Sequence, residues 1–140
     1  MRGVDDATAT PYGSPRPRAI RLTEPPASVA RMELCDYQGL SRRTATYPGA
    51  GENIVYPTLG LAGEAGEVAE KVKKLIRDDG GELTDERRAA LASELGDVLW
   101  YVAQVATEAD LQLEDIAAAN LDKLLSRQAR GVLSGSGDDR

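Results

Sequence analysis

The chain of 140 residues has a formal charge of −6, from 17 Lys and Arg against 23 Asp and Glu residues, which argues against binding nucleic-acid polymers through their phosphates. The chain has no His, which excludes Ser-His and Cys-His catalysis and argues against a zinc site. Cys35 is the single Cys, so no internal disulfide can form, and a reducing cytoplasm is the simplest setting. No apolar run is long enough to span a membrane, and the N-terminus lacks the apolar core of a signal peptide.

Composition divides the chain into a tail, a helical domain and a second tail. Residues 1–28 hold five of the seven Pro residues, which predicts a flexible segment. We expect one domain over residues 29–133 and a loose tail over residues 134–140. Most apolar residues are Ala, Leu and Val, and no strand-like alternation occurs, so the predicted fold class is all-α.

A first helix is predicted from about Ser28 to Thr46. Met32, Cys35 and Leu40 form a rough apolar face, on which Cys35 is expected to be a small buried residue. The Tyr-Pro-Gly run at 47–49 ends this helix, and a Gly-containing connection follows.

A second helix is predicted from about Pro57 to the Gly pair at 80–81. Its apolar stripe advances by four, three, four and three residues, through Leu61, Ala65, Val68, Val72 and Leu75.

A third helix is expected to follow Thr84, a suitable N-cap, and a fourth to run from near Glu114 to Gly131, a typical C′ residue. The stripe of the third helix is Leu91, Leu95, Val98, Val102, Val105 and Ala109. Short connections predict an antiparallel bundle of about four helices. Apolar faces this extensive on a short chain predict that oligomerisation completes the core.

Two pairs of acidic residues flank these stripes, and each pair contains an internal Gly, at Gly66 and Gly96. The pairs are Glu64 and Glu67 in the second helix and Glu94 and Asp97 in the third. A spacing of i, i+3 puts both acids on one helical face, so antiparallel packing through the stripes would bring the pairs face to face. Gly inside a helix costs about 1 kcal/mol relative to Ala, which favours room for a ligand or close helix packing.

Four carboxylates gathered in this way repel one another and lose hydration, so without a partner some of them take up protons. A hard divalent cation relieves both problems. Oxygen ligands without His favour Mg²⁺, with Mn²⁺ as the other candidate, over zinc or a di-iron centre. Solvated surface charge stays open as the alternative, because a single acid pair on a helix usually has no other role.

At these residues the chain resembles the MazG-like nucleotide pyrophosphohydrolases of the all-α NTP pyrophosphatase superfamily. That family carries Glu-x-x-Glu, a spacer and Glu-x-x-Asp, which here is Glu64-x-x-Glu67, 26 intervening residues and Glu94-x-x-Asp97. The surrounding segments LGLAGEAGEVAEKVKK (59–74), ELGDVLWY (94–101), DYQGLSRRTATYP (36–48) and ANLDKLLSRQARG (119–131) are also similar to the family.

The resemblance implies a Mg²⁺-dependent hydrolase that cleaves a (d)NTP between the α and β phosphates, giving a monophosphate and pyrophosphate, as in house-cleaning of nucleotide pools. Glu64, Glu67, Glu94 and Asp97 would hold the metal and form the catalytic centre. An acidic protein can bind this polyanion because the metal reverses the local charge. The resemblance also implies a homo-oligomer, a dimer or a tetramer, with sites at subunit interfaces.

Other residues are candidates for substrate contacts. Lys71 and Lys74 continue from the first acid pair at helical spacing, although they also suit the negative C-terminal end of their helix. Tyr101 matches a family position that contacts the nucleotide, with a core or rim role as the alternative. On the fourth helix the candidates are Asn120, Lys123, Arg127 and Arg130.

Two other functions stay open from the sequence. The chain is a non-catalytic nucleotide-binding or regulatory helical module, or it hydrolyses another pyrophosphate-containing metabolite, such as one resembling phosphoribosyl-ATP. The preferred base is not given by the sequence, although the loop over residues 48–57 and the first helix are expected to select it.

Overall fold

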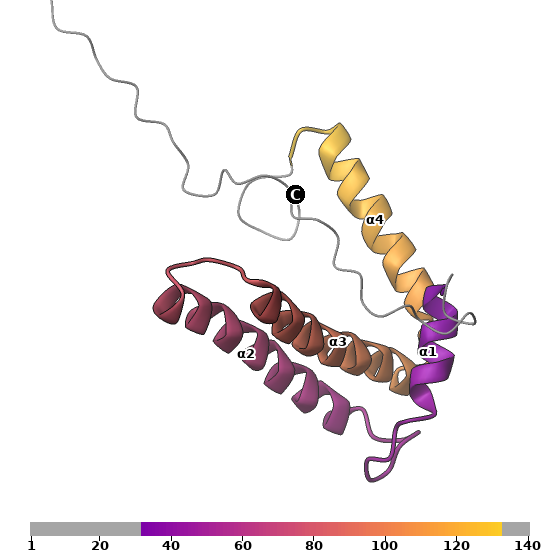
Figure 1. Cartoon of the computed structure of the whole chain (residues 1–140). Helices are drawn as coiled ribbons and strands as arrows, with labels where there is room; N and C mark the ends of the chain where they lie inside the picture. Colours follow the sequence, from indigo (N-terminus) through magenta and orange to yellow (C-terminus); the bar gives the residue numbers. More distant parts are fainter. Residues whose placement is uncertain (1–31, 133–140) are drawn as a thin grey trace, which may run out of the picture. The chain divides into compact units, whose positions relative to one another are not determined.

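The computed structural model describes residues 32–132, which form helices joined by turns, with no strand in that range. The helices are α1 (Leu34–Arg42), α2 (Val55–Asp78), α3 (Asp85–Glu108) and α4 (Leu113–Ala129) (Figure 1). The all-α prediction is therefore confirmed, whereas the predicted tails over residues 1–28 and 134–140 lie outside the described residues. None of the described helices combines the length and the apolar character needed to cross a lipid bilayer.

The first helix is shorter than the sequence suggested. It ends at Arg42, so the prediction that it reaches Thr46 is wrong, and its predicted start at Ser28 lies outside the described part of the chain. The backbone N–H and the hydroxyl of Thr44 both donate to the carbonyl oxygen of Ser41, at 3.0 and 2.7 Å. A side chain that satisfies this carbonyl replaces the next helical hydrogen bond and ends the helix.

Two further helix ends follow the predicted capping signals. The hydroxyl of Thr84 accepts a hydrogen bond from a backbone N–H three residues later. Gly131, at φ 70°, ends α4 as predicted. Asp110, at φ 56°, plays the same part after α3, where the N–H of Leu111 donates to the carbonyl of Ala106 at 2.9 Å. Asp is one of the few residues that tolerates this left-handed conformation.

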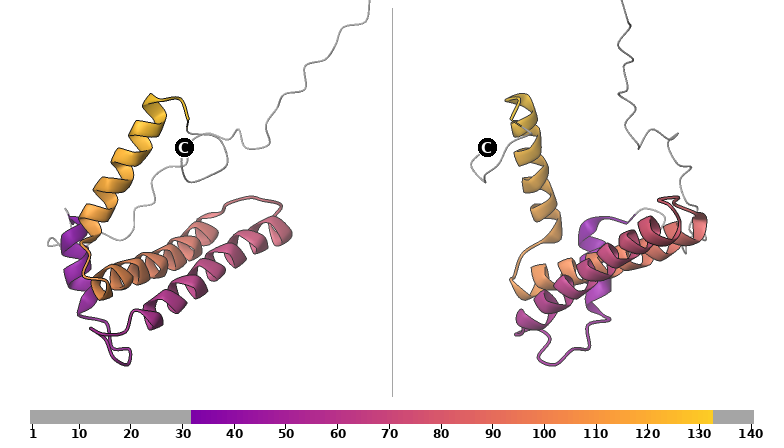
Figure 2. Two further views of the ribbon diagram at one scale, coloured as in Figure 1. Left: turned by 180° about the vertical axis from the view of Figure 1, so that it is seen from behind. Right: turned by 90° about the vertical axis from the view of Figure 1, so that its left-hand side faces the viewer.

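Helices α2 and α3 lie side by side and run antiparallel (Figures 1 and 2). Helix α1 packs against α3 and α4, and α4 contacts α1 and α3. Within the described residues, α4 makes no contact with α2. In the part of the chain that the structure describes, the α2–α3 hairpin is therefore the only pair of long helices packed along their length.

The predicted apolar stripes form the α2–α3 interface only in part, since Leu61, Val68 and Leu75 of α2 and four stripe residues of α3 are half-buried, as predicted. Between these stripe residues of α2, Glu64 and Lys71 are also half-buried, at the same spacing of three and four residues. Ala65 is exposed, Val72 is 40% exposed and Leu95 is 51% exposed, so their predicted burial is wrong within one chain. The helices are rotated so that charged residues take places along the interface.

The buried side chains gather instead where α1, α3 and the start of α4 meet. Ala103, Ala106 and Leu113 are buried there together with Gln104, which is fully inaccessible. The face of α1 that packs here carries polar residues, so the predicted apolar face is wrong. Its members Met32, Cys35 and Leu40 are all exposed.

One glycine allows a close contact within the hairpin. A Cβ atom at Gly60 would lie 2.1 Å from Cε1 of Tyr101, whereas one at Gly66 or Gly96 would meet no atom within 4 Å. Within residues 32–132, no other helix therefore approaches the two glycines of the acid pairs. The glycine that α2 requires for packing against α3 is Gly60.

We expect Gly60→Ala to destabilise the protein by about 2 kcal/mol, because the new methyl group forces the Tyr101 ring to move. Gly39→Ala is the matched control. It adds the same methyl group inside α1, where no atom lies within 4 Å, and should stabilise by up to about 1 kcal/mol. Urea unfolding followed by circular dichroism measures both changes, and equal shifts in the two variants would contradict the close contact.

Candidate functional site

Three of the four predicted acids come together between α2 and α3. Oxygen atoms of Glu64, Glu94 and Asp97 all lie within 4.8 Å of one another. Glu64 comes from α2 and the other two from α3. Glu64 and Glu94 are half-buried, and Asp97 is exposed. We call these three residues the acid cluster.

The acid cluster is electrostatically unfavourable by itself. Loss of hydration, followed by the negative charges of Asp97, Glu94 and Glu67, raises the pKa of Glu64 above its usual value. Carboxylate oxygens at this spacing are the ligand set that hard divalent cations prefer. The donor atoms and their mutual repulsion therefore fit a divalent cation.

Glu67, the fourth predicted acid, lies one turn along α2 from Glu64 and is exposed. It is not one of the three residues whose oxygen atoms converge, although its charge acts on Glu64. Glu67 is thus next to the acid cluster rather than inside it.

The two predicted lysines have different partners. Nζ of Lys71 lies 3.0 Å from Oε1 of Glu94, and this hydrogen bond and charge raise the pKa of Lys71. Nζ of Lys74 lies 3.6 Å from Oε1 of Glu70, on the same helix. Only Lys71 therefore contacts the acid cluster.

Two tyrosines lie near the acid cluster. Burial, followed by the charges of Tyr56, Glu64 and Asp97, raises the pKa of Tyr101. Burial and then the charge of Asp97 raise the pKa of Tyr37, which comes from α1. The sequence analysis included Tyr101 among the candidates and missed Tyr37, because nothing local shows that α1 passes close to Asp97.

An aromatic pocket adjoins Tyr101. It has a volume of about 300 Å³ and is lined by Thr44, Thr46, Tyr47, Pro48, Tyr56, Trp100 and Tyr101. The Tyr47 and Tyr56 rings stack with centroids 5.0 Å apart. Nε1 of Trp100 donates a hydrogen bond to Oγ1 of Thr44 at 2.8 Å. Tyr101 lies one turn after Asp97 on α3 and packs against Gly60, one turn before Glu64 on α2, so this pocket neighbours the acid cluster.

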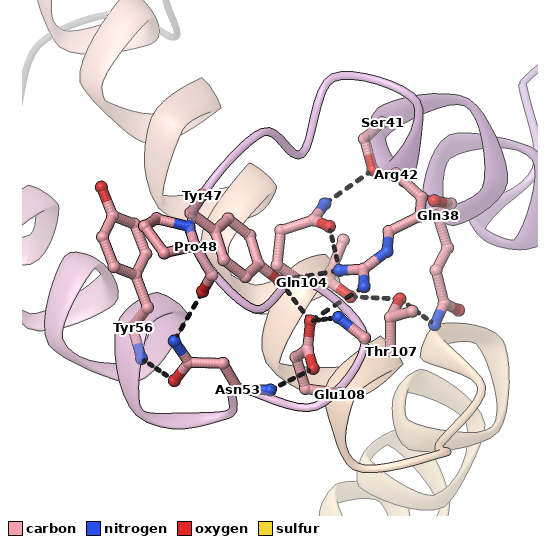
Figure 3. A network of polar contacts seen from close by, with 12 residues as sticks. Gln38, Ser41, Arg42, Tyr47, Pro48, Asn53, Tyr56, Gln104, Thr107 and Glu108 are labelled. Carbon is pink, nitrogen blue, oxygen red and sulfur yellow. Dashed lines mark hydrogen bonds and ion pairs between the residues drawn. The ribbon is translucent and has the colours of Figure 1, made fainter.

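A buried carboxylate, Glu108, holds the loop that forms one wall of the aromatic pocket (Figure 3). Its oxygens accept hydrogen bonds from the Tyr47 hydroxyl at 2.5 Å and from the backbone N–H groups of Gly51 and Asn53 at 2.8 and 2.9 Å. Nη2 of Arg42 completes the set at 2.9 Å. The Glu108 side chain has no exposed surface, so this set of contacts is a closed polar clamp.

The clamp lowers the pKa of Glu108 to about 2. The Tyr47 hydrogen bond is the largest cause, followed among the lowering contacts by the two backbone N–H groups and Arg42, while burial acts in the opposite direction. Sequence analysis missed this residue. One signal was available, because an acid in the last turn of a helix opposes the helix dipole and needs a compensating partner.

The predicted candidates on α4 are not brought to the acid cluster within one chain. Asn120 and Lys123 are exposed, and Arg127 is half-buried. Their helix contacts α1 and α3 but, in the described range, not α2, which carries Glu64. A role for these residues at the acid cluster of the same subunit therefore has no support from the packing.

The family model of the MazG nucleotide pyrophosphohydrolase domain matches residues 57–132, which include both acid pairs and more than half of the chain. The chain belongs to the MazG family. The Gene 37 protein of Mycobacterium phage L5 is 53% identical over 114 residues, which cover 78% of this chain and 100% of that protein. No solved structure matches this MazG chain. Membership indicates a nucleotide pyrophosphohydrolase, and MazG proteins generally depend on a divalent metal.

We expect Glu108→Gln to destabilise the protein by about 3 kcal/mol at pH 7, because it leaves Arg42 without its buried partner. The native carboxylate has a pKa of about 2, below the value of about 4.3 for an unfolded Glu. Its stabilisation is therefore complete above about pH 4.3 and is lost as the pH falls towards 2.

The measurement is urea unfolding of both proteins between pH 7 and pH 2.5. The difference in the free energy of unfolding between wild type and Glu108→Gln should become smaller below about pH 4.3. Glu52→Gln, which alters an exposed carboxylate in the same loop, is the control and should have little effect at any pH. A constant difference across this range would rule out the clamp as described.

Proposed function

We propose that this MazG protein is a Mg²⁺-dependent nucleoside triphosphate pyrophosphohydrolase, with Mn²⁺ as an alternative ion. It cleaves a (d)NTP between the α and β phosphates and releases a monophosphate and pyrophosphate. The observation that carries the proposal is the convergence of Glu64, Glu94 and Asp97 within 4.8 Å in a MazG domain. The exposed free thiol of Cys35 suits action in a reducing cytoplasm.

The acid cluster would hold the metal, with Glu67 as a further ligand one turn away. When bound, such an ion would neutralise part of the phosphate charge and would lower the pKa of a water molecule bound to it. By holding the ion, the carboxylates would position the triphosphate through it, and the exposed Asp97 and Glu67 leave the acid cluster open to solvent on one side. The ammonium of Lys71 adds a positive charge beside this face.

The aromatic pocket is the proposed place for the nucleoside. Flat aromatic side chains line it, and the Thr44 and Thr46 side chains add polar groups at its edge. Tyr101 lies between this pocket and the acid cluster, so a nucleotide along this path would have its phosphates at the carboxylates. The Glu108 clamp keeps the wall formed by Tyr47 in place.

The reaction test is a panel of nucleoside triphosphates with Mg²⁺, scored for pyrophosphate and for orthophosphate. We expect pyrophosphate, and a loss of at least about a hundred-fold in kcat/KM for Glu64→Gln and Asp97→Asn with helix content retained. Glu70→Gln is the control, because Glu70 pairs with Lys73 and Lys74 rather than joining the acid cluster.

Each other result points to a different function. Nucleotide binding without any product would favour a non-catalytic module. Turnover restricted to another pyrophosphate-containing metabolite would favour a different substrate class. Unchanged turnover in both acid variants would exclude the acid cluster as the catalytic site.

We also propose that the protein is a dimer or a tetramer. Ala65, Ala69, Val72 and Ile76 of α2, and Leu95 and Leu99 of α3, are all exposed in one chain. Each of the six directly follows a half-buried interface residue in the sequence. In a pair of antiparallel helices, residues at this offset lie on the same side of the pair. We call this set the apolar strip, and burial against a second copy would remove it from water. The α4 candidates Asn120, Lys123 and Arg127 would then act at a neighbouring subunit.

Light scattering after size-exclusion chromatography should give the mass of a dimer or a tetramer. The double variant Ile76→Asp with Leu95→Asp should shift the protein towards the monomer, because it places charges in the apolar strip. The control is Leu111→Asp, because Leu111 is 50% exposed but lies outside the apolar strip. This variant should keep the oligomeric mass of wild type. A wild-type mass equal to one chain would contradict the proposal.

A further inference from the structure

Lys71 contacts the acid cluster through Glu94, which is both a member of the cluster and the ion-pair partner of Lys71. Its Nζ lies 3.0 Å from Oε1 of Glu94, whose side chain is 17% exposed. Glu94 also converges with Glu64 and Asp97. An ammonium group therefore already occupies part of the space around the proposed cation ligands.

The neighbouring lysines show that this pairing is specific. Lys73 and Lys74 both pair with Glu70 on their own helix, at 3.3 and 3.6 Å. Lys71 instead reaches across to α3 from an interface position of α2, and its side chain is 32% exposed. The pairing thus offsets part of the charge of a repulsive cluster rather than adding another pair along one helix.

We propose that Lys71 is an exchangeable counter-ion of the acid cluster. A divalent cation that binds Glu94 displaces the ammonium, which then contacts the phosphates of the nucleotide. The identity of the cation and of the nucleotide rests on the proposed function.

Two physical features support the exchange. A divalent cation at Glu94 would lie within a few ångströms of the ammonium, where like charges repel strongly. The Lys side chain has a flexible four-carbon stem and three donors, so the ammonium can leave Glu94 while α2 stays in place, and it suits phosphate oxygens.

The exchange predicts coupling between metal and nucleotide. Without nucleotide, the displaced ammonium has no new partner, so Lys71 weakens cation binding. With nucleotide, the ammonium gains phosphate oxygens, so each ligand strengthens the binding of the other.

The test is titration of the full chain with Mn²⁺, with free ion measured by electron paramagnetic resonance in the absence of nucleotide. Lys71→Met keeps the length of the side chain without the charge and should bind Mn²⁺ roughly ten-fold more tightly. Lys73→Met removes the same charge from the outer face of the same helix and should change binding less than about two-fold. Lys71→Arg should restore the weak binding of wild type.

The same titration is repeated with an α,β-methylene analogue of dATP, which cannot be cleaved at the proposed bond. The analogue should tighten Mn²⁺ binding in wild type, and most of this gain should be lost in Lys71→Met. Circular dichroism melts confirm that each variant is folded, so the comparison is made between folded proteins.

The outcomes separate this inference from the proposed function. If wild type binds Mn²⁺ and Glu94→Gln does not, but Lys71→Met binds equally or more weakly than wild type, only the counter-ion role fails, and Lys71 merely ties α2 to α3. If wild type binds no Mn²⁺ with or without the analogue, the metal site and the exchange both fail.

Discussion

Repulsion among carboxylates at the α2–α3 interface is the constraint on which this protein depends. Glu64 and Glu94 take positions that apolar residues usually occupy in a helix pair, and Lys71 balances only part of their charge. The hairpin therefore cannot provide a dry core along its length. Burial is concentrated instead around Ala103, Ala106 and Leu113, where α1 and α4 meet α3. On α3, the members of the acid cluster and the buried residues therefore lie in separate regions of the helix.

The fold class and the acid pairs could be predicted because both depend on local patterns. Apolar residues at helical spacing and the Thr84 cap define the helices, and i, i+3 spacing puts each acid pair on one face. The rotation of each helix could not be predicted. Glu64 and Ala65 are neighbours in sequence, and the choice of which one faces α3 depends on the partner helix rather than on the local pattern.

The parts of the site that sequence analysis missed are formed by residues far apart in the chain. Glu108 is 61 residues from Tyr47 and 57 from Gly51, so its partners are known only from the fold. Tyr37 reaches the vicinity of Asp97 in the same way, through the placement of α1 against α3. Periodicity carries no information on such pairs, although an acid at the wrong end of the helix dipole was a usable local signal.

The contact between Gly60 and Tyr101 has a geometric consequence for the acids. Glu64 lies four residues after Gly60, and Asp97 lies four residues before Tyr101, so in antiparallel helices both acids are one turn from this contact in the same direction. A slide of α2 along α3 by one turn would change the axial offset between Glu64 and Asp97 by about 5.4 Å, which is more than the 4.8 Å within which the oxygens of the cluster lie. The ring of Tyr101 seated over Gly60 therefore sets the axial register at which the carboxylates from the two helices are level.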